Sequence, residues 1–208
     1  MARRQTRGDF VETESGNRIS RQATILGSQH ILLAGRSTIL PECVLRGDLY
    51  RRSSTSSAVI NIGRYVFLEK AVVLKPPSKL HHGANTHYPL RIGNSVTIGA
   101  NSVIEAAVIE SYVEIGQDCV IGKFAIIKEG VRIHPNSVVP STTCIPAYSE
   151  VSGNPAVIIN ELPESTWDIF DRKCRQLYAL HGTSLTTTSI KEIMSLVFDD
   201  DDDDSVDI

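Results

Sequence analysis

Aliphatic residues recur at every sixth position over much of the chain, and this period restricts the folds that the sequence can adopt. The longest unbroken series is Ile109, Ile115, Ile121, Ile127, Ile133, Val139, Ile145 and Val151. Shorter series with the same spacing precede it: Ile92, Ile98 and Ile104; Ile62, Leu68 and Leu74; Leu33, Ile39 and Leu45. An amphipathic helix would give a period near 3.6 and a single strand a period of 2, so neither explains the pattern.

A second series lies two positions before most of these aliphatic residues and consists of small or β-branched side chains, such as Val66, Ser102, Ala107 and Cys119. Glycine often follows the aliphatic residue, where we expect it to permit the tight backbone of a corner. Two inward positions in six fit short strands joined by corners, with three sides to a coil of about 18 residues. The sequence therefore predicts an all-β solenoid, a parallel β-helix of hexapeptide repeats, in which each coil contacts only its neighbours.

The period stops after Asn154-Pro155, and an α-helix is expected near residues 166–180, with Ser165 as its N-cap. One face of this helix should pack on the solenoid and carries Trp167, Phe170, Cys174, Leu177 and Tyr178. We divide the chain into an N-terminal segment (1–22), the β-helix (23–160), the C-terminal helix (161–182), and a linker with an acidic tail (183–208) expected to be disordered.

Charge and composition exclude several function classes. The formal net charge of −3 includes the seven aspartates of Asp199–Asp204 and Asp207, and no basic stripe interleaved with aromatic residues predicts nucleic-acid binding. No apolar run approaches the length of a membrane span, so membrane insertion is not expected. The four cysteines are scattered, as is typical of a reduced protein, and we expect a cytoplasmic location.

The repeat is interrupted at residues 46–61 and 75–91, and the spacing from Ile104 to Ile109 drops to five, which we interpret as one tightened corner. Residues 75–91 form either a degraded coil or a projecting loop, and Pro76-Pro77 favours the loop because proline supplies no ladder donor. We identify a candidate partner-binding loop here, whose alternative role is to cover a flank of the solenoid. Its residues are Lys75, Pro76, Pro77, Lys79, His81, His82 and Tyr88.

Arg46-Gly47-Asp48 before a hexapeptide array resembles the γ-class carbonic anhydrases, which bind zinc through three histidines. Alignment with that family gives Lys75, Ala100 and Glu105 at the three ligand positions. A protonated ammonium cannot coordinate zinc, so we expect no metal and interpret Arg46 and Asp48 as a structural ion pair. The only histidine cluster, His81, His82 and His87, is expected to be part of an exposed polar loop.

Gly153-Asn154-Pro155-Ala156 also resembles the hexapeptide acyltransferases, which use a histidine as general base. His134 is the only histidine in the regular array, and no sequence feature indicates an acyl-CoA pocket. We therefore expect no catalytic residue and no cofactor.

Motifs outside the repeats resemble the dynactin subunit 5 family from about residue 10 to 181. They are residues 12–22, 27–31, 43–49, Lys75-Pro76-Pro77, 89–93, 110–113 and 161–164. The resemblance implies a left-handed β-helix in the dynactin pointed-end complex, in the cytoplasm and on the cytoskeleton. It implies a second β-helix subunit, an actin-related protein and a larger zinc-binding subunit as partners, and a role in binding dynein cargo adaptors. The alternatives are a γ-carbonic-anhydrase-like zinc enzyme and a hexapeptide acyltransferase. For the Ser-rich stretch at 53–57 and the acidic tail the resemblance implies nothing.

Overall fold

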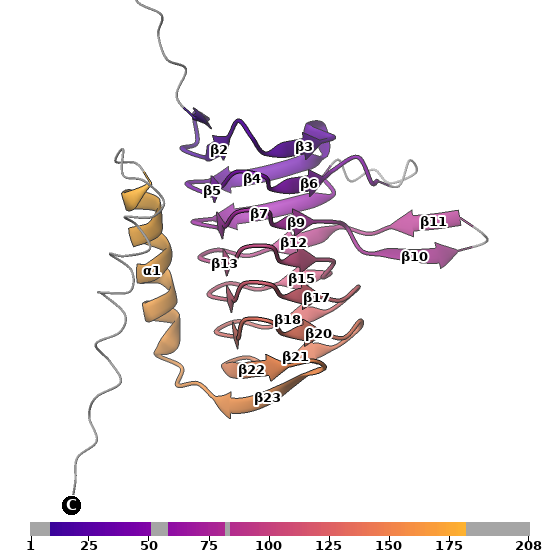
Figure 1. The fold of residues 1–208 in the computed structure, drawn as a ribbon, viewed down its shortest axis with the longest axis vertical. Helices are drawn as coiled ribbons and strands as arrows, with labels where there is room; N and C mark the ends of the chain where they lie inside the picture. The colour runs from indigo at the N-terminus through magenta and orange to yellow at the C-terminus, as the bar shows by residue number, and fades with distance from the viewer. Residues whose placement is uncertain (1–8, 51–57, 82–83, 182–208) are drawn as a thin grey trace, which may run out of the picture.

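The protein is a left-handed parallel β-helix with one α-helix along its side (Figure 1). The computed structural model describes residues 9–50, 58–81 and 84–181. The tail at 183–208, which we expect to be disordered, lies outside these residues, as does the Ser-rich stretch at 53–57. The predicted fold class, including the C-terminal helix, is confirmed.

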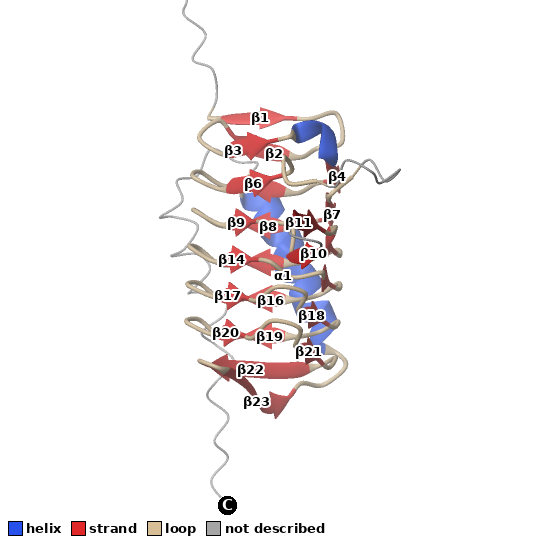
Figure 2. Cartoon of the chain, turned by 90° about the vertical axis from the view of Figure 1, so that its right-hand side faces the viewer, coloured by secondary structure: helices blue, strands red, loops and turns tan. Residues whose placement is uncertain are grey.

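Three sheets form the three sides of the β-helix, which has the shape of a prism. Sheet A contains nine strands in the order β1 (Phe10–Glu12), β2 (Arg18–Ser20), β5 (Thr38–Ile39), β8 (Phe67–Leu68), β13 (Thr97–Ile98), β16 (Glu114–Ile115), β19 (Arg132–Ile133), β22 (Ser149–Gly153) and β23 (Ala156–Glu161). Sheet B contains β3 (Thr24–Leu26), β6 (Val44–Arg46), β9 (Val73–Leu74), β14 (Val103–Ile104), β17 (Val120–Ile121) and β20 (Val138–Val139). Sheet C contains β4 (Ile31–Gly35), β7 (Ile60–Arg64), β12 (Leu90–Ile92), β15 (Val108–Ile109), β18 (Ile126–Ile127) and β21 (Cys144–Ile145). Figure 2 shows the strands of sheet B stacked one above another, with the helix behind them.

Parallel pairing places each repeat residue over its counterpart in the next coil. Ile109 lies opposite Ile127, and Ile127 opposite Ile145. The last residue of nearly every short strand points inward, and the aliphatic series from Ile109 to Val151 is at most 4% exposed. Leu33, near the N-terminal end, is only partly buried. The six-residue period predicted from the sequence is therefore the interior column of the solenoid.

The second interior column joins neighbouring coils through hydrogen bonds. Ser102 Oγ donates to Gly116 O (3.0 Å) and accepts from Cys119 N (3.1 Å). Cys119 Sγ in turn donates to His134 O (3.1 Å). Ser102 and Cys119 thus each satisfy a backbone group of a neighbouring coil, as is usual for buried polar atoms. At the tightened corner Ala106 is fully buried, whereas Ala107, expected inside, is only partly buried because the corner is one residue shorter.

The glycines that follow the interior aliphatic residues are required by close approach between coils. A Cβ built on Gly63 would lie 2.3 Å from Gly93 O, and one on Gly99 would lie 2.4 Å from Gln117 N. The left-handed backbone of the corners is instead adopted by other residues, including Arg36, Tyr65 and Tyr112. Our expectation that these glycines serve the corner conformation is corrected: they give the next coil's backbone room to pass.

Antiparallel strands cover both ends of the β-helix. β1 pairs with β2 at the N-terminal end, and β23 pairs with β22 at the other. β2 also pairs in parallel with β5, with Ile19 opposite Ile39, so the first coil starts at Arg18. Residues 18–22, which we assign to the N-terminal segment, therefore contribute a strand to sheet A.

The helix α1 (Thr166–Leu180) packs on sheet A and runs back toward the N-terminal coils (Figure 1). Phe170, Cys174 and Leu177 are buried, and Leu177 contacts Leu40 and Phe67. Trp167, expected on the buried face, is 44% exposed and lies against the ring of Tyr112 at the flank. Ser165 is the N-cap residue, but its side chain forms no capping hydrogen bond.

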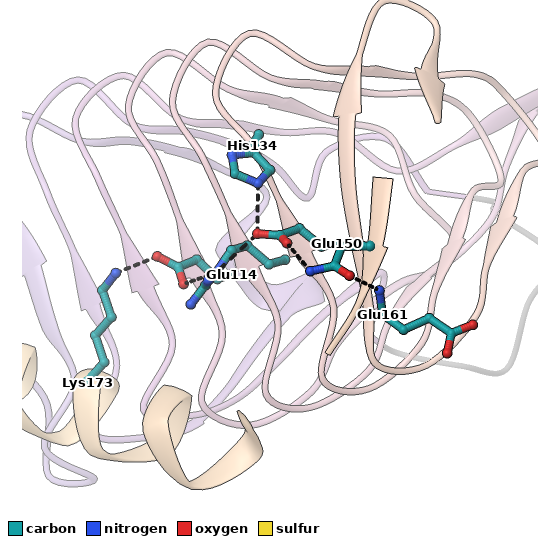
Figure 3. Close-up of polar contacts among 7 residues, drawn as sticks. Glu114, His134, Glu150, Glu161 and Lys173 are labelled. Carbon is teal, nitrogen blue, oxygen red and sulfur yellow. Dashed lines mark hydrogen bonds and ion pairs between the residues drawn. The ribbon is translucent and has the colours of Figure 1, made fainter. Parts of the chain in front are cut away.

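A chain of charged side chains fixes α1 to the sheet (Figure 3). Lys173 Nζ donates to Glu114 on β16, and Arg132 on β19 lies between Glu114 (3.4 Å) and Glu150 (3.7 Å). His134 Nε2 lies 2.9 Å from Glu150 Oε1. Burial raises the pKa of Glu150, but His134, Asn160 and Arg132 outweigh burial and lower it overall. His134, the residue considered as a general base, is therefore part of this network.

The register of the interior column can be tested with one substitution at two adjacent positions. Ile121 is fully buried and Val120, its neighbour on β17, is 41% exposed. We expect Ile121→Asp to cost several kcal/mol of the free energy of unfolding, because a buried carboxylate loses its hydration. Val120→Asp should change it by about 0.5 kcal/mol or less. Chemical denaturation of both variants checks this, and equal stabilities would contradict the register.

Candidate protein-binding site

The interruptions of the repeat lie along one edge of the β-helix, where the chain passes from sheet B to sheet C. We call it the B–C edge; of the described residues it carries the 3-10 turn Ser28–His30, residues 47–50 and 58–59, residues 75–81 and 84–89, and the tightened corner at 105–107. Helix α1 covers sheet A, on the opposite side of the prism (Figure 1). The B–C edge therefore concentrates the irregular chain on one side of a rigid scaffold, where functional loops are commonly found.

Residues 75–91 project from this edge as a β-hairpin. β10 (Ser78–His81) pairs antiparallel with β11 (Ala84–His87), with Ser78 opposite His87 and Leu80 opposite Asn85. At its base Tyr88 N donates to Pro77 O (2.9 Å). The segment is thus a projecting hairpin and not a degraded coil, and the chain returns in register because Leu90 lies opposite Ile60.

The seven residues predicted for partner binding fall into two groups. Pro76 and Pro77 are buried and support the base, and Lys75 is partly buried. Lys79 is exposed, and Tyr88 is 38% exposed with its ring 5.4 Å from that of Phe124. His81 is the last residue of β10, and His82 lies outside the described residues. The structure thus separates a supporting base from an exposed arm.

Leu80 is the most exposed large hydrophobic residue of the described chain, at 69%. The sequence analysis did not select it, since a lone leucine in a polar loop gives no periodic signal. Only the pairing of β10 with β11 shows that Leu80 lies in a two-stranded arm outside the core. An apolar side chain in this position is available to a partner.

An ion pair joins two of the three residues that the sequence analysis predicts at zinc-ligand positions. Lys75 Nζ lies 2.7 Å from Glu105 Oε1, and Lys75 N donates to Ile104 O in the adjacent coil. The Glu105 side chain is only 16% exposed. At the third position, Ala100 N donates to Glu69 Oε2 (3.0 Å). Two of the three positions therefore hold charges that neutralise one another.

Arg46 and Asp48 lie on the same edge and form a two-point ion pair. Arg46 Nε and Nη2 donate to the two carboxylate oxygens of Asp48 at 2.8 and 2.9 Å. The guanidinium lowers the pKa of Asp48. Burial, together with the charges of Lys75 and Arg46, lowers the pKa of His87, so its imidazole is neutral near pH 7. The edge thus holds fixed charges and a neutral histidine.

Among the residues that the structure describes, no three His, Cys, Asp or Glu side chains come together to hold a metal ion.

Burial raises the pKa of the Cys43 thiol to about 11 and that of Cys174 to about 12, so both remain protonated at neutral pH. No helix in the described part of the chain combines the length and apolar character that a bilayer crossing requires.

Comparison with known proteins relates this chain to one family and to several β-helix proteins. The model of the dynactin subunit 5 family matches residues 4–183. Dynactin subunit 5 of Dictyostelium discoideum is 35% identical over 105 residues, which are 50% of this chain and 49% of that protein. Mitochondrial gamma carbonic anhydrase 1 of Arabidopsis thaliana is 28% identical over 147 residues, 70% of this chain and 49% of that protein. The chain spans about half the length of these curated relatives.

Among solved structures, AntD, an N-acyltransferase from Bacillus cereus crystallised with dTDP and 3-hydroxybutyryl-CoA, superimposes with a TM-score of 0.59. The match covers 77% of this chain and 88% of AntD at 14% identity, so it establishes the fold alone.

Fold and edge together define a hexapeptide-repeat β-helix whose B–C edge carries a projecting hairpin and an ion pair between Lys75 and Glu105. Since the family model covers most of its length, the chain belongs to the dynactin subunit 5 family.

The energetic link between Lys75 and Glu105 can be measured with a double-mutant cycle. We expect Lys75→Met and Glu105→Gln to show a coupling of about 1 kcal/mol in the free energy of unfolding, because the carboxylate is largely buried. The control pair is Lys70 and Glu42, whose side chains are 60% and 56% exposed. Its coupling should be near zero. Equal couplings for the two pairs would contradict the expectation that burial of Glu105 strengthens its ion pair with Lys75.

Proposed function

We propose that this chain is a non-catalytic subunit of the dynactin pointed-end complex, located in the cytoplasm and on the cytoskeleton. In this role it joins a second β-helix subunit, an actin-related protein and a larger zinc-binding subunit. It supports dynein-dependent binding of cargo adaptors on microtubules. Membership of the dynactin subunit 5 family supports the general role. The adaptor role depends on the hairpin.

The absence of a catalytic role is supported by the ion pair at the aligned ligand positions. A catalytic zinc site needs three protein ligands and an open position. Lys75 is engaged with Glu105 at 2.7 Å, and a protonated amine has no lone pair to offer a metal. Converting this edge to a zinc site would break the ion pair and replace both residues.

The single observation that carries the adaptor role is the projecting hairpin of β10 and β11. Its exposed Leu80 offers an apolar contact, and Lys79 beside it offers a positive charge. Within the described chain each hairpin strand pairs only with the other, so backbone groups remain available along the outer edges. A two-stranded arm with free edges can accept an extended segment of a partner by strand addition.

A double variant of the exposed arm tests this role. Lys79→Ser with Leu80→Ser should leave the melting temperature within about 2 °C of the native chain, because both side chains are exposed. Recovery of cargo adaptors on the tagged chain from native extract should fall several-fold, while recovery of the other dynactin subunits is unchanged. The control, Lys70→Ser with Val120→Ser, removes one exposed charge and one exposed apolar side chain elsewhere.

Normal adaptor recovery by the hairpin variant would leave the hairpin with a covering role only. A folded variant that fails to join the other subunits would instead place the hairpin at a subunit interface.

Metal analysis tests the non-catalytic assignment. We expect the purified chain to carry no stoichiometric zinc and to show no hydration of carbon dioxide, because Lys75, Ala100 and Glu105 stand at the ligand positions. Elemental analysis after dialysis against zinc measures the first, and stopped-flow hydration the second. One zinc per chain, lost on replacing His81, His82 or His87, would overturn the assignment.

A further inference from the structure

A second surface feature lies on the edge where sheet C passes into sheet A, at the N-terminal end. A cavity of about 350 Å³ is lined by Ser15, Ala34, Gly35, Arg36, Arg64 and Tyr65. Arg36 and Tyr65 occupy the same corner in successive coils, both in the left-handed backbone conformation (φ 54° and 56°). The solenoid thus stacks these corners and brings residues 29 positions apart into one wall.

Two arginines of this cavity lack an acidic partner. Arg36 and Arg64 are exposed, and no carboxylate of the described residues lies within 4 Å of either guanidinium. Nearby arginines are paired: Arg18 lies 3.6 Å from Glu12, and Arg175 lies 2.5 Å from Asp171. Two guanidiniums that no carboxylate neutralises, beside one cavity, produce a local positive potential that attracts anions.

Tyr65 is held in place between the charged groups. Arg36 Nη1 donates to Tyr65 Oη, and the guanidinium of Arg175 lies 4.6 Å from the centre of the ring. The ring of Tyr178 on α1 meets that of Tyr65 edge-on, at 5.9 Å. A wall fixed in this way loses little conformational entropy on binding. Arginine recognises carboxylates with two parallel hydrogen bonds, so an acidic peptide suits this cavity.

The chain carries such an acidic segment, and the helix that precedes it ends near the cavity. α1 ends at Leu180 beside the cavity, since Tyr178 Oη donates to Gly16 O (2.9 Å) and Arg18 donates to Tyr178 O. Residues 182–198 follow, and an extended chain of that length reaches on the order of 50 Å. The run Asp199–Asp204 can therefore reach Arg36 and Arg64 within the same molecule.

We propose that the cavity lined by Arg36, Arg64 and Tyr65 binds acidic peptide segments and that the chain's own Asp199–Asp204 run occupies it. Tethering raises the effective concentration of the run to about the millimolar range, so weak individual contacts suffice. An acidic segment of another protein would have to displace the run. The site would thus be self-inhibited, independently of the hairpin on the B–C edge.

A competition experiment with the full chain tests the proposal. The probe is a fluorescein-labelled peptide with the sequence of residues 195–208, followed by fluorescence anisotropy. We expect the native chain to bind it weakly, because its own tail occupies the cavity. A neutral-tail variant, in which Asp199–Asp204 and Asp207 are all replaced by Asn, should bind it about tenfold more tightly. Raising the salt from about 0.05 M to about 0.5 M should remove most of this binding, as expected for exposed charges.

Matched variants locate the site. In the neutral-tail background, Arg36→Gln with Arg64→Gln should weaken peptide binding about tenfold or more, and Tyr65→Phe tests the phenol without losing the ring. The control, Lys79→Gln with Arg91→Gln, removes two exposed positive charges elsewhere and should leave binding unchanged. Melting temperatures verify folding.

Two results would overturn the proposal. Equally tight peptide binding by the native and neutral-tail chains would show that the tail does not occupy the cavity. Binding that is absent from the neutral-tail chain, or insensitive to the Arg36 and Arg64 substitutions, would show that the cavity is not an acidic-peptide site.

Discussion

Hydrogen bonding between successive coils is the constraint on which the rest of this structure depends. The strands are too short to stand alone, and each satisfies its backbone groups on the coils before and after it, as when Gly99 N donates to Ile115 O and Gly116 N to Ile133 O, both at 2.8 Å. This pairing requires aliphatic residues to stack in register and glycines where one coil passes close to the next. An insertion is tolerated only where the chain leaves the ladder of hydrogen bonds and re-enters it in the same register.

The insertions in this chain lie at the B–C edge. The chain leaves the ladder after β6 and again after β9, both in sheet B, and it re-enters in register at β7 and β12 of sheet C. At this edge Lys75 and Glu105, which the sequence predicts at zinc-ligand positions, form an ion pair. The edge thus combines charge pairing with an exposed arm.

Helix α1 links the two ends of the solenoid. It begins beside the C-terminal coils and ends beside the N-terminal ones, held by Lys173 on Glu114 and by Tyr178 on Gly16. Burial of Phe170, Cys174 and Leu177 against the sheet adds apolar stabilisation to these polar contacts. The return of α1 also brings the end of the described chain, at His181, beside the N-terminal coils.

The sequence was sufficient to predict the β-helix, its interior column, the helix near 166–180 and the position of the projecting segment in the chain, because a six-residue period and a proline pair are local signals. It could not show that the interruptions share one edge, that Leu80 is exposed on a hairpin, that Trp167 lies at a flank, or that Arg36, Arg64 and Tyr65 line one cavity. The physical reason is that the number of residues in each coil decides which residues of successive coils lie against one another. A repeat specifies which residues point inward, but only the stacked ladder sets which corners meet.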